Sequence, residues 1–158
     1  MREELDKALC EKYPKIFRDR NAPMSETCMC WGFSHGDGWY NIINGLCATI
    51  QSHVDWAEKR RAWEVEKGQA GEEGYPRTPH VEQVVATQVK EKFGGLRFYY
   101  DGGDDYIRGA VSMAETMAAI TCEECGKPGE LRTGGWMRTL CDEHEAERQE
   151  RLKERANV

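Results

Sequence analysis

Hydrophobic residues recur at helical spacing in three stretches of the chain, residues 2–13, 39–66 and 106–120. In the longest stretch, large apolar residues fall three and four positions apart, which places them on one side of a helix. We therefore predict a short first helix and two longer helices whose apolar sides face the core. The core positions expected on the longer helices are Trp39, Ile42, Ile43, Leu46, Ile50, Val54, Ala57, Ile107, Val111, Ala114 and Ala118.

Other stretches alternate between apolar and polar residues and predict strands. Residues 81–92 and 96–100 are joined by the tight turn Phe93-Gly-Gly, so we expect a hairpin there. A further short strand is expected at residues 28–33. Polar, Gly- and Pro-containing segments predict loops at 18–27 and 68–80 and a turn at 34–38. Asp37 in that turn is expected to cap the following helix by accepting from its first backbone amides.

Together these elements predict an α+β fold in which a small antiparallel sheet packs on the two main helices. We expect residues 1–121 to form this core domain. Residues 122–158 are expected to form a metal-binding module that continues into a charged C-terminal helix. In that helix the charges alternate, and Glu147 and Arg151 are spaced to form an ion pair on its surface.

The charge and cysteine content of the chain limit its expected partners and cellular location. A formal net charge of −6 gives the chain no overall basic character of the kind that nucleic-acid-binding proteins show. The chain starts with charged residues, and no apolar run approaches the roughly 18 residues of a membrane span. Seven cysteines, an odd number, favour metal ligands and buried thiols over a disulfide framework. We therefore expect a cytoplasmic protein without membrane contact.

The strongest chemical signal is the spacing Cys-x2-Cys-x15-Cys-x2-His, formed by Cys122, Cys125, Cys141 and His144. Two residues between ligands let both side chains reach one ion, and the long spacer can return the second pair to the first. Three thiolates and one imidazole fill the four tetrahedral positions of zinc. The sequence therefore predicts one structural zinc ion with no open position for substrate.

The residues around these ligands are consistent with a zinc module. Gly126 permits the tight turn after the second cysteine, and residues 133–135 form a turn between two short strands at Leu131 and Trp136. A helix is expected to start at Cys141. This order of turn, hairpin and helix is similar to a treble-clef zinc finger. Three nearby cations are expected to offset the negative charge of the thiolates, namely Lys127, Arg132 and Arg138.

A second cluster of candidate ligands lies earlier in the chain. Cys28, Cys30, His35 and Cys47 would hold a second metal only if the turn and helix fold back onto the first two cysteines. The alternative is that these cysteines are small buried thiols. The sequence leaves both interpretations open, and favours the buried thiols.

Two groups of side chains are candidates for partner binding. Trp56, Arg60 and Trp63 recur on one side of the long helix, and Trp and Arg are over-represented at binding hot spots. On the zinc hairpin, Arg132, Trp136 and Arg138 form the second group. The alternative for the two tryptophans of the helix is flat packing on the rest of the domain.

Four motifs of the chain are distinctive, namely GDGWY at 36–40, VKEKFGGLRFY at 89–99, GDD at 103–105 and CEECGKPG at 122–129. At these motifs, and over most of its length, the chain resembles a family of small proteins from bacteriophages, prophages and their proteobacterial hosts. The resemblance implies a phage setting but no established activity and no catalytic residues. The zinc module alone is similar to that of the DksA/TraR transcription factors, which bind RNA polymerase, although His144 stands where that family usually has Cys.

From these observations we predict a non-catalytic phage-type protein that binds a host or phage protein complex and modulates it, for example as an anti-CRISPR-like inhibitor of host defence. The alternative is a nucleic-acid-binding or transcription regulator that acts through the zinc hairpin, with Lys127, Arg132 and Arg138 contacting phosphates. A hydrolase that uses His35 and Asp37 is a third interpretation.

Overall fold

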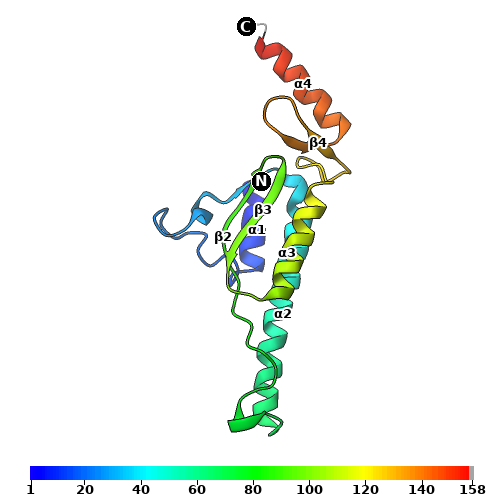
Figure 1. Ribbon diagram of the computed structural model, residues 1–158. Coiled ribbons are helices and arrows are strands. Elements are labelled where there is room, and N and C mark those ends of the chain that lie inside the picture. The colour runs from blue at the N-terminus through cyan, green and yellow to red at the C-terminus, as the bar shows by residue number, and fades with distance from the viewer. Residues whose placement is uncertain (157–158) are drawn as a thin grey trace.

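The computed structural model describes residues 1–156, and in it the chain forms an elongated molecule with the metal-binding residues at one end (Figure 1). The last two positions of the predicted C-terminal module, 157 and 158, lie outside the described residues. The helices are α1 (Glu3–Lys12), α2 (Tyr40–Glu66), α3 (Asp105–Ala118) and α4 (Asp142–Ala156). The strands are β1 (Phe33–Ser34), β2 (Val85–Lys92), β3 (Gly95–Asp101), β4 (Glu130–Arg132) and β5 (Arg138–Leu140).

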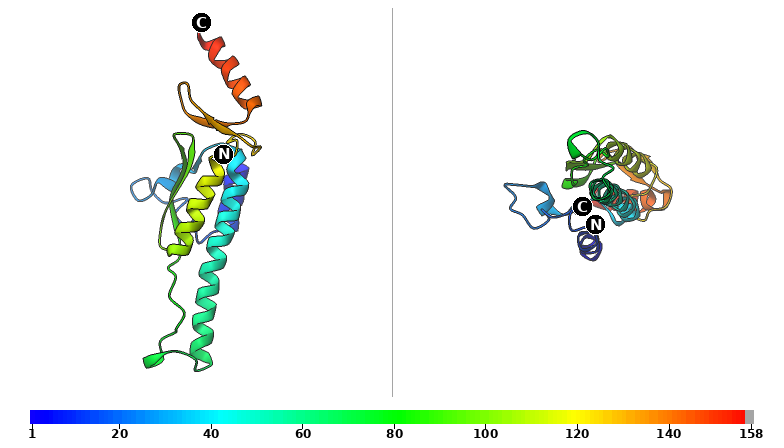
Figure 2. Two further views of the ribbon diagram at one scale, coloured as in Figure 1. Left: turned by 45° about the vertical axis from the view of Figure 1, so that its right-hand side comes forward. Right: turned by 90° about the horizontal axis from the view of Figure 1, so that it is seen from below.

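The predicted apolar sides of the two main helices form the core. On α2 the predicted side is buried from Trp39 to Ala57, with Ile42 half-buried, and on α3 all four predicted positions are buried. The two helices run antiparallel to each other and pack side by side against the β2–β3 hairpin (Figures 1 and 2). Asp104 begins α3 as its cap, because its carboxylate accepts from the Ile107 amide at 3.1 Å.

The first sheet has the order β1–β2–β3. Strands β2 and β3 are antiparallel, and their two-residue turn places Phe93 at φ 55° and Gly94 at φ 79°, as a type I′ hairpin turn requires. The predicted α+β class is confirmed, with one refinement: β1 pairs parallel to β2, so the sheet is mixed.

The predicted strand at residues 28–33 is mostly a 3₁₀ helix, Cys28–Trp31, and only Phe33 and Ser34 enter the sheet. The Thr27 hydroxyl accepts from the Met29 amide at 3.1 Å and so caps this turn. Gly32 ends it at φ 71°. A local side-chain cap therefore overrides the alternation of apolar residues in this segment.

The far half of α2 extends beyond the sheet and is flanked by the loop at 68–80 (Figure 2). Glu64 anchors this loop, because its buried carboxylate accepts from the amides of Arg77 at 2.7 Å and Thr78 at 3.0 Å. The Thr78 hydroxyl donates to the same carboxylate at 2.7 Å. These hydrogen bonds, those of Thr78 first, lower the pKa of Glu64 to about 2. The Arg61 guanidinium donates to the Thr78 carbonyl at 2.6 Å, so two charged side chains of α2 order the loop.

No helix within residues 1–156 combines the length and the apolar character that crossing a bilayer requires.

Candidate metal centre

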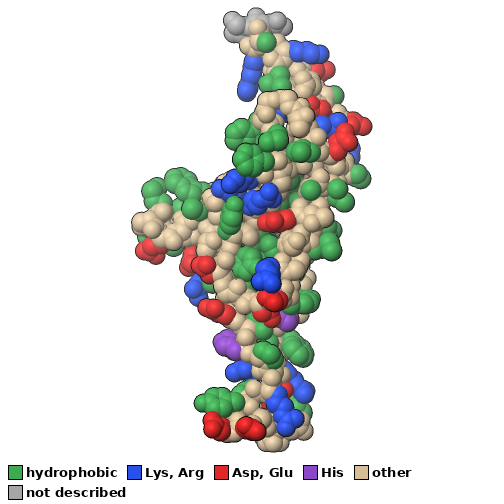
Figure 3. Space-filling view, in the orientation of Figure 1, with side chains coloured by type: hydrophobic (Ala, Val, Ile, Leu, Met, Phe, Trp, Pro, Cys, Tyr) green, Lys and Arg blue, Asp and Glu red, His purple; other side chains and the backbone are tan. Residues whose placement is uncertain are grey.

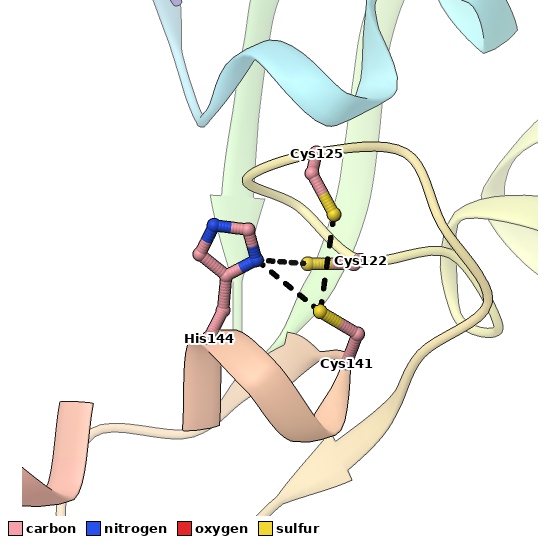
Figure 4. Close-up of side chains that lie close together, drawn as sticks. All are labelled: Cys122, Cys125, Cys141 and His144. Carbon is pink, nitrogen blue, oxygen red and sulfur yellow. Dashed lines mark hydrogen bonds between the residues drawn. The ribbon is translucent and has the colours of Figure 1, made fainter. Parts of the chain in front are cut away.

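The four predicted ligands come together at the end of the molecule that carries α4 (Figure 4). Cys122 and Cys125 lie in the turn that follows α3, Cys141 follows β5, and His144 lies in the first turn of α4. Their sulfur atoms and the His144 ring nitrogen all lie within 4.8 Å of one another. This is the one such group of three or more Cys, His, Asp or Glu side chains within the described part of the chain.

The distances between these atoms fit a tetrahedral ion. Sγ of Cys125 lies 3.8 Å from Sγ of Cys141. Nδ1 of His144 lies 3.6 Å from Sγ of Cys122 and 3.2 Å from Sγ of Cys141. Metal–sulfur bonds of about 2.3 Å and metal–nitrogen bonds of about 2.0 Å at tetrahedral angles separate ligand atoms by about 3.5 to 3.8 Å. The donor set can therefore hold a metal ion with only small adjustments.

The backbone around the ligands follows from a few local interactions. Gly126 adopts φ 76°, and its amide donates to the Cys122 carbonyl at 2.9 Å, which closes the first turn. Strands β4 and β5 then form the short hairpin that returns the chain to this turn. Leu131 lies in β4 as predicted, whereas Trp136 lies in the loop before β5.

Cys141 is the thiol most prepared for metal binding. The backbone amide of His144 donates to its sulfur, and this hydrogen bond together with the His144 ring lowers the pKa of Cys141 to about 7. The Cys122 side chain is fully buried, and Cys141 is nearly so. The site thus combines two buried sulfur atoms, one of them a stabilised thiolate, with the exposed Cys125 and the half-buried His144.

The motif Gly36-Asp-Gly-Trp forms the seat on which the first metal-binding turn rests. The Gly36 amide donates to the Glu123 carboxylate at 3.0 Å, the Gly38 amide donates to the Glu123 carbonyl at 2.7 Å, and the Trp39 indole donates to the Thr121 carbonyl at 2.9 Å. A β-carbon on Gly38 would lie 2.1 Å from the Cys122 carbonyl oxygen. Only glycine therefore permits this approach.

The predicted capping role of Asp37 is wrong. Its carboxylate instead accepts from the Arg2 amide at 2.7 Å, immediately before α1, and pairs with the Arg2 side chain. No side chain caps the start of α2. The adjacent His35 is buried between Phe33 and Trp39. Its burial lowers the pKa to about 4, so its imidazole is neutral at pH 7.

The hairpin of the metal module also contacts the β2–β3 turn. The Thr139 hydroxyl donates to the Gly94 carbonyl at 2.6 Å, and a β-carbon on Gly94 would lie 2.3 Å from the Leu131 side chain. The Trp136 indole donates to the Glu91 carboxylate at 3.0 Å. The metal-binding end and the sheet therefore meet at this turn.

Each of the three predicted cations of the module is paired with carboxylates. Lys127 lies 2.8 Å from Glu143. Arg132 contacts Glu130 at 2.7 Å and Asp142 at 2.6 Å. Arg138 contacts Glu123 at 3.1 Å and Glu124 at 2.6 Å. These cations consequently neutralise acidic neighbours, and their charge is only partly available to the thiolates or to another molecule.

Two charged residues that hold the module together were not predicted. Glu123 is buried, which raises the pKa of its carboxyl group, and it joins Gly36 to Arg138. Arg148 of α4 is also buried and donates to the carbonyls of Gly134 at 3.0 Å and Trp136 at 2.6 Å. In the sequence neither residue differs from the solvated charges around it, so no local pattern could have identified them.

The second candidate cluster is not assembled. Cys28 is exposed at the start of its 3₁₀ helix, Cys30 is half-buried, and Cys47 is buried within α2. The sulfur of Cys30 donates to the Thr27 carbonyl at 3.1 Å. In residues 1–156 these cysteines and His35 do not form a metal-binding group.

The six predicted partner-binding residues lie in two separate regions. Trp56, Arg60 and Trp63 lie on the far half of α2, and the other three lie at the metal-binding end (Figure 1). Trp56 and Trp136 are exposed, and Trp63 is half-buried beneath the Arg60 guanidinium, which is centred 4.4 Å from its ring.

Comparison with known proteins gives no match to any family model, any curated protein or any solved structure.

Proposed function

We propose that the chain is a non-catalytic, zinc-containing protein that binds a protein complex through an apolar stripe along α3 and α2. The stripe is defined as Tyr106, Met113 and Met117 of α3 and Ile120 in the turn that follows it, together with Trp56 of α2. It is the observation that carries the proposal, because large exposed apolar surfaces rimmed by polar residues are typical of protein-binding sites.

The outer side of α3 is apolar and exposed, which is unusual in a chain with so many charged residues. Met113 and Ile120 are 62% and 66% exposed, and Met117 between them is also exposed. From Gly109 in α3 to Ile120 just after it, the chain has one charged residue, Glu115, whose carboxylate accepts from the Phe98 amide at 3.1 Å and so turns toward the sheet. In a chain with 32% charged residues, three helical turns without an outward charge favour a side that a partner covers.

The stripe continues from α3 onto α2. Tyr106 stacks on His53 with ring centroids 4.3 Å apart. Trp56 lies one helical turn beyond His53 on the same side of α2, and Arg60 and Trp63 follow at the same spacing. The predicted contact residues of α2 therefore extend the apolar side of α3 toward the far end of the molecule.

Zinc is the metal that best fits the four ligands. Three sulfur atoms and one imidazole nitrogen are the ligands of structural zinc, and they occupy all four tetrahedral positions. Bound zinc would hold the first turn, the hairpin and the start of α4 together. Native mass spectrometry tests this assignment: we expect one zinc ion per chain, lost in Cys141→Ser, whereas a different metal at full occupancy would contradict it.

For the setting of the partner we propose the phage or its host cytoplasm, and the support is the resemblance to phage and prophage proteins. Inhibition of a host defence system is one form that such binding takes. This part of the proposal rests on the resemblance, whereas the binding surface rests on the stripe.

Affinity capture followed by mass spectrometry tests the stripe. Met113→Glu places a charge at its centre, and the matched control Met24→Glu places the same charge on an equally exposed methionine of the 18–27 segment. We expect a partner captured by the natural sequence and by Met24→Glu but lost with Met113→Glu. Capture that is the same with all three proteins would contradict binding through the stripe.

A further inference from the structure

The outer face of the β2–β3 hairpin, together with the tip of the metal module, forms a second surface of different chemistry. Lys90 and Arg97 are directly opposite each other in the register, and Lys92 and Tyr99 are each two residues further along the same face. Phe93 in the turn and Trp136 of the module complete it. We name these six residues the basic–aromatic face: Lys90, Lys92, Phe93, Arg97, Tyr99 and Trp136.

The cations of this face differ from the others at this end of the molecule. Within residues 1–156, no carboxylate forms an ion pair with Lys90, Lys92 or Arg97. Lys90 instead lies 5.7 Å from the centre of the Tyr99 ring, and Lys92 lies 5.6 Å from that of Phe93. Three unpaired cations on two adjacent strands make a local positive surface on a chain of net charge −6.

The aromatic side chains are held open to solvent. Phe93 is 66% exposed and Trp136 is 73% exposed, and both line a groove of about 440 Å³. Its other lining residues are Lys90, Glu91, Lys92, Gly135 and Met137, so one carboxylate lies among the cations. Figure 3 shows hydrophobic side chains at the metal-binding end next to a group of Lys and Arg side chains over β2 and β3. The hydrogen bond from the Trp136 indole to Glu91 fixes the ring at the edge of this groove.

The conformation of Phe93 is a separate indication that this face is used. Its φ of 55° lies in the left-handed region, where the first residue of such a turn is usually Asn, Asp or Gly. A bulky residue there costs on the order of 1 kcal/mol or more of backbone strain. The I′ turn accounts for the φ angle itself, whereas an exposed aromatic ring at this strained position favours a contact between the ring and another molecule.

Two classes of partner would match positive charge and exposed rings: single-stranded nucleic acid and an acidic protein segment. Lysine is depleted at protein–protein interfaces, and two of the three cations here are lysines. Cations that follow a backbone of phosphates, with rings on which bases stack, are the combination that single strands require. The observations therefore favour nucleic acid.

We propose that the basic–aromatic face binds single-stranded nucleic acid, with phosphates on Lys90, Lys92 and Arg97 and bases stacked on Phe93, Tyr99 and Trp136. This site is distinct from the apolar stripe, because α3 packs on the opposite face of the hairpin. It is also distinct from the paired cations of the zinc hairpin.

Fluorescence anisotropy with labelled oligo-dT and oligo-U of about 12 nucleotides tests the proposal on the zinc-loaded full chain. We expect binding at low salt that weakens with a log–log slope of about −2, since three phosphate contacts contribute about −0.7 each. Tighter binding of one probe identifies DNA or RNA as the preferred strand. A duplex of the same length is expected to bind more weakly than either.

Variants of single side chains locate the site. Lys92→Gln, which changes one exposed side chain, is expected to reduce the slope by about 0.7. Trp136→Ala and Phe93→Gly are each expected to weaken binding about tenfold or more. Lys127→Gln removes the same charge from the zinc hairpin and is expected to leave binding unchanged.

Three results would overturn the proposal. The first is no oligonucleotide binding at low salt by protein that contains one zinc ion per chain. The second is loss of binding in Lys127→Gln but not in Lys92→Gln. The third is displacement of the oligonucleotide by polyglutamate as effectively as by unlabelled oligonucleotide, which would assign the face to an acidic protein segment. None of these results bears on capture through the apolar stripe, so the two proposals fail separately.

Discussion

Gly38 lies just before α2 and packs directly on the backbone of the metal-binding turn at Cys122 to Gly126. A β-carbon there would lie 2.5 Å from the Gly126 amide nitrogen and 2.8 Å from that of Cys125, in addition to its clash with Cys122. These are backbone atoms of the turn that presents two ligands, so they cannot move aside without moving the metal site. The geometry of the metal site therefore requires that residue 38 has no side chain.

We predict that Gly38→Ala weakens metal binding and lowers the free energy of unfolding by about 2 kcal/mol or more. Chelator competition and thermal unfolding measure the two effects. Gly45→Ala is the control, because this helical glycine has nothing within 4 Å of the added carbon and the substitution should stabilise α2 by about 0.5 to 1 kcal/mol. Equal effects of the two substitutions would contradict the close contact.

The buried imidazole of His35 leads to a second prediction about a single residue. Its Nδ1 lies 2.7 Å from the Gly36 carbonyl oxygen, and its Nε2 is buried without a partner. With a pKa of about 4 in the folded state and 6.5 as its ordinary value, the unfolded chain binds a proton that the native state does not between these pH values. Stability should therefore fall as the pH is lowered from 6.5 to 4, by at most about 1.4 kcal/mol per pH unit.

Denaturant unfolding of the natural sequence and of His35→Phe over this pH range measures the effect. The metal site also titrates in this range, but it contributes to both proteins and cancels in the comparison. The variant should show a smaller slope of stability against pH. Identical slopes would mean that His35 is protonated as readily in the native state as in the unfolded chain.

At the scale of elements, the parts that the sequence predicts are those built from local periodicity. The buried sides of α2 and α3 follow from spacing alone, and the β2–β3 hairpin follows from a glycine-containing turn between two alternating runs. The metal ligands follow from spacing as well. The seat at 36–39 does not, because its partners lie more than 80 positions away and glycines followed by Trp read locally as a turn.

The role of Glu64 could not be predicted from the sequence either, because Glu64 is one of several glutamates on α2. We predict that Glu64→Gln releases the 68–80 loop, because a neutral amide accepts hydrogen bonds from Arg77 and Thr78 more weakly than a carboxylate does. Hydrogen exchange of the Arg77 and Thr78 amides measures the release. Glu66→Gln, an exposed position paired only with Lys67, should leave this exchange unchanged.

The hydrogen bonds by which Glu64 holds the 68–80 loop should also weaken at low pH. The folded pKa of Glu64, about 2, is below its ordinary value of 4.5. Its stabilising contribution is therefore complete above pH 4.5 and is lost as the pH falls toward 2. Because intrinsic amide exchange itself slows as the pH falls, the measured quantity is the protection factor, and protection of the Arg77 and Thr78 amides that does not decrease through this range would show that other contacts hold the loop.

At the scale of the whole molecule, the chain consists of a body, residues 1–121, and the metal module that follows it, and the two differ in the size of their apolar cores. The body has a continuous apolar core that extends from Leu9 through α2 to Ala118. The metal module has only a small buried cluster of Cys122, Leu140 and Cys141. A cluster of this size cannot offset the conformational entropy of ordering the module, so we expect a metal ion held by the four ligands to supply most of its stability.

We therefore predict that metal removal unfolds residues 122–148 while the body stays folded. After chelation, amide protection should be lost in β4, β5 and the start of α4 and should persist at Ile43 to Ala57 of α2 and Ile107 to Ala118 of α3. Oligonucleotide binding should weaken about tenfold, as in Trp136→Ala, because Trp136 loses its position while Lys90 and Arg97 keep theirs. Cys141→Ser should give the same pattern without chelator. Loss of protection in α2 together with the module would instead show that the seat at Gly36 to Trp39 couples both parts into one cooperative unit, and that the metal stabilises the entire fold.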